Sequence, residues 1–255
     1  MLVLGLEGGA GMVGVALAQD GSVLAEVNLR QPQSQSELVI PLVDEVLKHA
    51  GVRGEDLDAL AVDIGPGTYT GIRVGIATAQ GLAAAWQKPV SGVQSLAVLA
   101  AQACPGGGRA GVLLPARHRT VTAALVAVDA WPQTAATCVW GPAMLAIDDF
   151  LPVLAQWAGE APFVLTGPGV DQHRELLMPP EDGQSQVFPG WVVAADRLPR
   201  AGVVALLGEV SIRRGQGVEP WQVQPVYAKE YAPSHRSNAA DGLGPSRQER
   251  EKKVP

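Results

Sequence analysis

The chain has 255 residues, 47% of them hydrophobic, so it is long enough for one large domain or two small ones with a buried core. Its formal net charge of −6 argues against direct nucleic-acid binding through electrostatics, because neutralising phosphates needs a patch of Lys and Arg. No apolar run approaches the roughly 18 residues that span a bilayer, and the first residues lack the features of a secretory signal. We therefore expect a soluble, cytoplasmic protein.

The first hundred residues predict three strands followed by alternating helices and strands. Asp20-Gly21 between two apolar runs indicates a hairpin, and Leu38, Leu42 and Val46 share one face of the next helix. This order predicts a mixed sheet with helices on both faces. The expected elements are strands over 2–6, 12–18 and 23–29, a helix over 38–48, a strand over 57–64, a helix over 70–86, a strand over 88–93 and a helix over 94–103.

The glycine-rich segment Cys104–Gly111 marks the expected boundary between two halves. From residue 232 the chain is polar and turn-rich with almost no apolar anchor, which is typical of a disordered tail. The expected domains are therefore residues 1–105, residues 106–231 and a tail over 232–255. In the second domain we expect strands over 111–114 and 120–129, a helix over 144–157, a strand entering a glycine turn over 162–169, and a helix over 199–215.

The stretch from Asp63 to Trp86, DIGPGTYTGIRVGIATAQGLAAAW, joins a strand to a helix through a Gly-Pro-Gly turn. It has neither the lysine of a P-loop nor the glycine spacing of a dinucleotide-binding loop. Two interpretations stay open. Either the free N–H groups at the start of the helix bind an anion, or the segment is a tight turn capped by Thr68 or Thr70.

Small residues recur on one face of the helix that follows this turn. Gly71, Gly75, Ala79 and Ala83 are spaced by four, although a helical glycine lowers stability by roughly 1 kcal/mol relative to alanine. A close backbone approach would explain their presence. The approaching element is either this protein's own sheet or first helix, or a helix of a second chain.

The sequence offers little that is typical of a catalytic or metal site. The four histidines, His49, His118, His173 and His235, are scattered, and no two have the i, i+4 spacing of a helical metal site. No Gly-x-Ser-x-Gly elbow occurs. The two cysteines are expected to be buried thiols in a reducing compartment.

The run Gly65–Gly81, GPGTYTGIRVGIATAQG, resembles the G-P-G-[ST]-[FY]-T-G-[IV]-R-[IV]-G stretch of the bacterial TsaB family, also called YeaZ. The opening strand pair at Leu4–Leu17, the first helix and the segment Lys88–Ala100 are also similar to this family. The second half is similar only in layout. The resemblance implies an α/β, actin-like and sugar-kinase-like (ASKHA) fold of two ribonuclease-H-like lobes with mixed sheets, the second lobe being degenerate.

By this resemblance we expect a non-catalytic paralogue of the transferase TsaD, in the pathway that makes threonylcarbamoyladenosine in transfer RNA. The implied role is a scaffold that forms a heterodimer with the TsaD-type transferase and meets a TsaE-type ATPase through that complex. Self-association is expected when the chain is alone, and tRNA is reached only indirectly. The family pairs through two helices of the N-terminal lobe. The residues expected at that interface are Leu38, Leu42, Val46, Gly71, Ile72, Gly75, Ile76, Ala79 and Ala83.

Departures from the family weaken a nucleotide site. Glu7-Gly8-Gly9-Ala10 stands where the family usually has Asp-Thr-Ser-Thr, so the hydroxyls that organise Mg²⁺ and phosphate in actin-like ATPases are missing. Pro115 replaces a common aspartate, and Gln35 a usual histidine. We therefore expect no metal and no cofactor, with ATP or ADP limited to the interface of the complex. The alternative is a weak actin-like ATPase or small-molecule kinase that holds a nucleotide between the lobes with Glu7, Gly8, Gly9, Thr166, Gly167 and Gly169.

Overall fold

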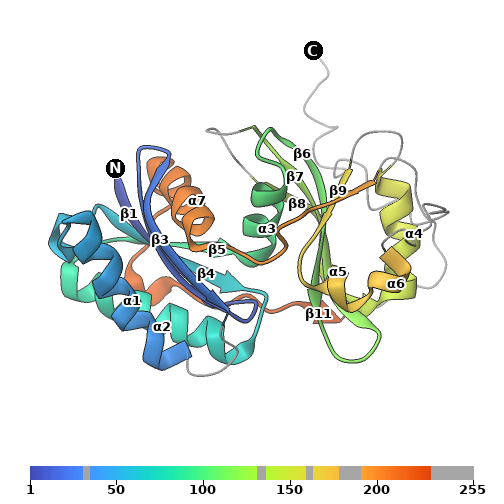
Figure 1. The fold of residues 1–255 in the computed structure, drawn as a ribbon, viewed down its shortest axis with the longest axis horizontal. Coiled ribbons are helices and arrows are strands. Elements are labelled where there is room, and N and C mark those ends of the chain that lie inside the picture. The colour runs from blue at the N-terminus through green and yellow to red at the C-terminus, as the bar shows by residue number, and fades with distance from the viewer. Residues whose placement is uncertain (31–34, 131–135, 159–162, 178–190, 231–255) are drawn as a thin grey trace, which may run out of the picture.

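The structure, a computed structural model, describes residues 1–30, 35–130, 136–158, 163–177 and 191–230. These residues form two mixed β-sheets that lie side by side, each with helices on both faces (Figure 1). The layers alternate between helices and sheets, as the sequence analysis predicts for an α/β protein. The tail expected over 232–255 lies outside the described residues.

The first sheet has the strand order β3-β2-β1-β4-β5. The first three strands are antiparallel, and Asp20 and Gly21, both with positive φ, form the predicted hairpin turn. The last two strands add to β1 in parallel, because a helix carries the chain back before each of them. The strands are β1 (Leu2–Glu7), β2 (Met12–Gln19), β3 (Ser22–Arg30), β4 (Ala59–Gly65) and β5 (Val90–Gln94).

Two helices, α1 (Gln35–Ala50) and α2 (Tyr69–Trp86), cover the outer face of this sheet (Figure 1). They enclose an apolar cluster that includes Leu4 and Leu60 from the sheet. A short 3₁₀ helix at Gly54–Asp56 connects α1 to β4. Two of the three helices predicted for residues 1–105 therefore form and lie on this face.

The second sheet repeats the topology of the first, in the order β10-β9-β6-β7-β8-β11. Strands β6, β7 and β8 are antiparallel, and β9 and β10 extend β6 in parallel, as β4 and β5 extend β1. Two lobes with this strand order define the ribonuclease-H-like pair predicted from the sequence. The strands are β6 (Gly108–Pro115), β7 (Thr120–Val128), β8 (Ala136–Ala146), β9 (Phe163–Thr166), β10 (Trp191–Val193) and β11 (Lys229–Glu230).

The layer between the sheets contains α3 (Ser95–Ala103) and α7 (Ala201–Arg213) (Figure 1). α3 follows the first sheet in sequence and packs on β6, β7 and β8, whereas α7 comes late in the chain and packs on the first sheet. Gly5 permits a close approach there, because an added Cβ would lie 2.7 Å from the carbonyl oxygen of Ala201. Each sheet is thus covered on its inner face by a helix from the other half of the chain.

Three helices cover the outer face of the second sheet: α4 (Ile147–Ala158), α5 (Gly169–Gln172) and α6 (Arg174–Leu177). Phe150 and Phe163 are fully buried beneath them. This lobe therefore has an apolar core of its own, separate from the core under α1 and α2.

The segment 223–230, which we call the C-terminal strap, connects the lobes. It follows a 3₁₀ helix at Pro220–Gln222, and Val223 is buried in the core of the first lobe. The Val226 N–H donates to the Ile64 carbonyl at 2.8 Å, and β11 then pairs in parallel with β8. The strap therefore contacts both sheets.

Two expectations about the second half are wrong. The helix expected from residue 144 begins at Ile147, because the preceding residues belong to β8 and pair with β7. Cys138 is exposed on β8 rather than buried, whereas Cys104 is buried, and both are free thiols. The small strands β10 and β11 were not predicted either, since their pairing depends on distant partners.

Candidate functional site

Two carboxyl side chains meet where the central strands of the first sheet end. β1 and β4 are parallel with Leu6 opposite Val62, so Glu7 and Asp63, the next residues of each strand, are neighbours on the same face. Both side chains are removed from solvent, with exposed fractions of 2% for Glu7 and 1% for Asp63. The register of the sheet therefore creates a buried carboxyl pair.

Burial controls the protonation of this pair. Removal from water raises the pKa of Glu7 well above its ordinary value, and the charge of Asp63 raises it further. Burial also raises the pKa of Asp63 to about 6, although hydrogen bonds from Ser95 and Gly65 act in the opposite direction. Ser95 Oγ donates to Asp63 Oδ1 at 2.6 Å, and the Gly65 N–H donates to the same oxygen at 2.9 Å. Burial therefore disfavours ionisation of both carboxyl groups and raises the pKa of each.

Glycines close the loop between β1 and β2 over this pair. The Gly9 N–H donates to Glu7 Oε1 at 2.7 Å, and an added Cβ at Gly9 would collide with Asp63 Oδ2. The Gly9 carbonyl accepts the Thr68 N–H at 2.6 Å, which fixes the loop to the Gly-Pro-Gly turn. Gly67 packs against the backbone of Gly9 so closely that a side chain at Gly67 would force the two apart. The carboxyl pair is consequently sealed under backbone.

The Gly-Pro-Gly turn itself is a tight strand-to-helix connection. Thr68 is the N-cap residue of α2, but its hydroxyl makes no capping hydrogen bond and lies 3.5 Å from the Gly8 carbonyl oxygen. The expected cap by Thr68 is therefore wrong, because this residue is used to hold the loop of β1. Pro66 follows a cis peptide bond.

A cavity of about 450 Å³ lies above the sealed pair, between the two lobes. Its walls are mostly apolar, and hydroxyls of Thr68, Thr122 and Tyr227 supply the polar side chains. The other lining residues are Gly9, Ala10, Gly11, Pro66, Gly67, Leu114, Pro115, Met144 and Ala228. This is the cleft in which the fold would place a nucleotide.

The residues present do not fit a magnesium nucleotide. Of the six positions expected to bind one, Gly9 lines the cavity, while Glu7 lies beneath it. Thr166 is fully buried, and Gly167 and Gly169 press on Leu113 of β6 rather than lining the cavity. Among the described residues, no Asp or Glu lines the cavity, and the carboxyl groups of Glu7 and Asp63 are buried beneath it.

The small-residue stripe of α2 faces the protein's own sheet. An added Cβ at Gly75 would lie 3.6 Å from Val62 Cγ2 of β4, and an added Cβ at Gly8 would lie 2.7 Å from the Gly71 carbonyl oxygen. The stripe expected at a partner interface is therefore buried within this chain, where it faces Val62 of β4 and the backbone of Gly8. Buried in this way are Leu42, Val46, Gly71, Ile72, Gly75, Ile76, Ala79 and Ala83, and Leu38 is half-buried.

The opposite face of the same helices is open. On α1, Ile40 is 50% exposed. On α2, Tyr69 is 61% exposed, and Ala77, Gly81 and Ala84 also face solvent. This open face, which we call the outer face of α1 and α2, combines Ile40, Tyr69 and small side chains of α2 with exposed charged residues of α1 such as Asp44, Glu45 and Lys48.

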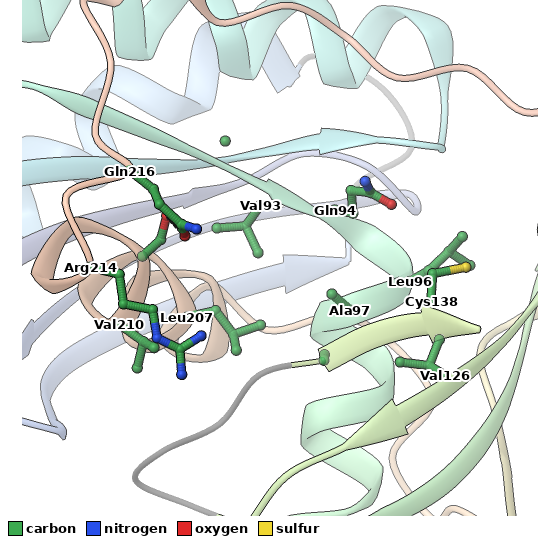
Figure 2. A pocket seen from close by; sticks show the side chains of 13 residues that line it. Val93, Gln94, Leu96, Ala97, Val126, Cys138, Leu207, Val210, Arg214 and Gln216 are labelled. Atoms are coloured by element: carbon green, nitrogen blue, oxygen red, sulfur yellow. Dashed lines mark hydrogen bonds between the residues drawn. The ribbon is translucent and has the colours of Figure 1, made fainter. Parts of the chain in front are cut away.

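A second cavity, of about 260 Å³, lies between α7, α3 and the second sheet (Figure 2). Val93, Val126 and Leu207 form apolar walls, and Arg214 and Gln216 come from the segment that follows α7. It contains none of the residues expected to bind a nucleotide. Among the residues that the structure describes, no group of three or more His, Cys, Asp or Glu side chains is suited to a metal ion.

Sequence reasoning identified Glu7 but missed Asp63 and Ser95. Asp63 had a signal, because it interrupts an apolar strand just before a glycine turn. Ser95 had none, since only the fold brings the start of α3 to this position.

The two lobes with their repeated strand order, and the cleft between them, define the class: a two-lobed α/β protein of the actin-like and sugar-kinase-like type. The family model described as tRNA N6-adenosine threonylcarbamoyltransferase, TsaD, matches residues 22–178, more than half of the chain. Two solved structures from Pseudomonas aeruginosa superpose on it. One is described as an uncharacterized protein with similarity to peptidase YEAZ, with a TM-score of 0.74 at 30% identity over 89% of this chain and 98% of that one. The other, YeaZ, gives 0.73 at 29% identity over 89% and 99%.

Curated relatives carry a matching name. The "tRNA threonylcarbamoyladenosine biosynthesis protein TsaB" of Escherichia coli is 36% identical over 113 residues, which are 44% of this chain and 48% of the relative. The TsaB of Bacillus subtilis is 34% identical over 101 residues, 40% of this chain and 44% of the relative. The match thus spans about half the length of these relatives. The chain belongs to the TsaB (YeaZ) family, as the motif at Gly65–Gly81 predicts. Within the described residues, no helix is long and apolar enough to cross a membrane.

Proposed function

We propose that the chain is a non-catalytic subunit of the machinery that makes threonylcarbamoyladenosine in tRNA, and that it pairs with a TsaD-type transferase. Family membership supports the pathway, because the matching family model and the curated relatives are named for it. The observation that carries the non-catalytic role is the sealed pair of Glu7 and Asp63.

The sealed pair supports this role for a physical reason. An actin-like ATPase needs ionised carboxylates that face the cleft and organise Mg²⁺, since magnesium prefers oxygen ligands that it can reach. Here burial raises the pKa of both carboxyl groups, which disfavours their ionised forms, and they lie under the Gly9 backbone. We infer that the cleft of this chain does not process a nucleotide, and that any ATP or ADP binds where the subunits of the complex meet.

The outer face of α1 and α2 is the surface that we propose for pairing. It combines the half-exposed Ile40 with small side chains of α2, which let another helix approach closely. The same surface would serve self-association when the transferase is lacking. A TsaE-type ATPase then joins through the complex. Contact with tRNA is indirect, since the net charge is −6, and the proposed compartment is the cytoplasm.

Reconstitution tests this proposal. Purified transferase is mixed with the chain, and complex formation is measured by size-exclusion chromatography with light scattering, alongside threonylcarbamoyl transfer to tRNA. Ile40→Asp should weaken the complex and reduce transfer. Leu24→Asp is the matched control, because Leu24 is equally apolar and 52% exposed but lies on the edge strand β3 rather than on either helix.

Two results would contradict the proposal. One is a wild-type chain that neither binds the transferase nor changes its activity. The other is saturable Mg-ATP turnover by the isolated chain that Glu7→Ala abolishes, which would establish an ATPase or kinase instead.

A further inference from the structure

Three residues from distant parts of the chain form an exposed aromatic and cationic cluster, which we call the Tyr69–Arg73–Tyr227 cluster. Tyr69 and Arg73 lie one turn apart on α2, and Tyr227 comes from the C-terminal strap. The two tyrosine rings are stacked, with centroids 6.1 Å apart and planes inclined by 23°. Arg73 Cζ lies 4.1 Å from the centroid of the Tyr69 ring, and its Nε donates to the Tyr227 hydroxyl at 3.1 Å.

The cluster is unusual because it is ordered yet exposed. Tyr69 is 61% exposed and Tyr227 47% exposed, and Arg73 also faces solvent. A long arginine side chain on a surface ordinarily keeps its rotamer freedom, which is lost on binding. Here the ring beneath and the hydroxyl beside the guanidinium hold it in one geometry. Such preorganisation reduces the entropy lost when a partner binds.

The charge of Arg73 has no counterpart within the described residues. Both of its contacts, the Tyr69 ring and the Tyr227 hydroxyl, are uncharged, and no carboxylate of that part of the chain pairs with it. Because Nε is used by Tyr227, the two terminal nitrogens remain to donate. Two parallel N–H bonds from these nitrogens fit the two oxygens of a carboxylate.

We propose that the Tyr69–Arg73–Tyr227 cluster binds an acidic side chain of the partner protein. The inference rests on the proposed pairing with a TsaD-type transferase and names the chemistry of one contact in it. The cluster begins α2 and so continues the outer face of α1 and α2, while Tyr227 also lines the cleft cavity. A partner carboxylate on Arg73 would therefore fix the partner at the mouth of the cleft. Tyrosine and arginine are the residues in which interface binding energy is most often concentrated.

Binding measurements on the full chain test this contact. The dissociation constant for the purified transferase is measured by isothermal titration for wild type, Arg73→Ala, Arg73→Lys and Tyr227→Phe. We expect Arg73→Ala to raise the dissociation constant by about 30-fold, the effect of losing an arginine in which interface binding energy is concentrated. Arg73→Lys should recover only part of this loss, because an ammonium group cannot form the paired bonds. Tyr227→Phe should lose less than Arg73→Ala, since it removes the hydroxyl that orients the guanidinium.

Salt and a matched arginine provide controls. Raising NaCl from about 0.1 to 0.5 M should weaken wild-type binding more than that of Arg73→Ala, because screening acts on the charge that the variant lacks. Arg119→Ala should bind as wild type does, since Arg119 is an exposed arginine on the second lobe whose charge is already paired with Asp148. Unchanged thermal unfolding of each variant would show that the fold is intact.

Chemical cross-linking identifies the carboxylate. A water-soluble carbodiimide joins a carboxylate to a neighbouring amine, so Arg73→Lys should become linked to an aspartate or glutamate of the transferase, found by mass spectrometry. A link to an acidic residue of this chain's own segment 231–255 instead would overturn the proposal.

The outcomes separate the two proposals. If the wild type binds and Ile40→Asp does not, but Arg73→Ala binds within twofold of wild type with the same salt dependence, this inference fails and the proposed function stands. If the wild type does not bind the transferase, both fail.

Discussion

Replacing Asp63 by asparagine tests whether the carboxyl pair is buried with raised pKa values. Asparagine keeps an oxygen for the Ser95 hydroxyl and the Gly65 N–H, and it places an amide group at the position of Asp63 Oδ2, which is buried without a hydrogen-bond partner among the described residues. The substitution therefore removes one ionisable group with little change in shape. Any change in the pH dependence of stability then comes from the titration of the pair.

The sign and the size of the pH effect on the free energy of unfolding follow from the raised pKa of Asp63. The pKa of Asp63 is about 6 in the folded chain, against 3.8 for an ordinary aspartate, the value that we take for the unfolded chain. At a pH between these two values the folded chain therefore binds a proton that the unfolded chain has released. The contribution of Asp63 to the free energy of unfolding is therefore fully present below about pH 4, and it is lost as the pH rises through 6. A difference of about 2 units corresponds to about 3 kcal/mol. The raised pKa of Glu7 acts in the same direction.

Urea unfolding followed by circular dichroism at a series of pH values from 4 to 8 measures this effect. We expect the free energy of unfolding of Asp63→Asn, relative to wild type, to increase by about 3 kcal/mol between pH 4 and 7. Asp44→Asn, a substitution at an exposed carboxyl on α1, should show no such change. A wild-type-to-variant difference that stays constant across this range would refute the burial and the raised pKa values of the pair.

Three glycine substitutions test the packing around the pair and α2. Gly9→Ala should lower the free energy of unfolding by about 1–3 kcal/mol, because its Cβ would collide with Asp63; equal stability would mean that the loop is not closed as described. Gly75→Leu should lower the free energy of unfolding of the isolated chain by a similar or larger amount, because the leucine side chain would be forced against Val62. Wild-type stability of this variant would instead show that the small-residue stripe of α2 faces solvent. Gly81→Ala should stabilise α2 by up to about 1 kcal/mol, because no atom lies within 4 Å of an added Cβ and alanine favours the helix. A lower thermal stability of this variant would contradict the open position of Gly81.

Much of the first lobe was predictable because its signals are local. The Asp20-Gly21 turn, the apolar strands and the helical periodicity of α1 and α2 are set by neighbouring residues, and the structure places each element near its expected bounds. The second lobe was predicted less well. β8 was missed because the pattern of 136–146 does not alternate cleanly, and its strand conformation is stabilised by pairing with β7.

The candidate site was predictable only in part. Periodicity showed that the small residues of α2 share a face, but not which neighbour covers that face. A sheet and a second helix would both require small residues at the same four-residue spacing. The structure assigns the stripe to β4, with Gly75 beside Val62. The partner surface that we propose is therefore the opposite side of the helices that the sequence identified.

The sequence by itself indicated the family and the succession of strands and helices along the first lobe, because the Gly65–Gly81 motif and the periodic apolar patterns depend on residues close together in the chain. Tertiary structure alone decided that Glu7 faces Asp63, that the stripe of α2 is buried and that Tyr227 reaches Arg73. These features depend on strand register and on the path of the C-terminal strap. Contacts of that kind join residues far apart in the chain, so no local pattern specifies them.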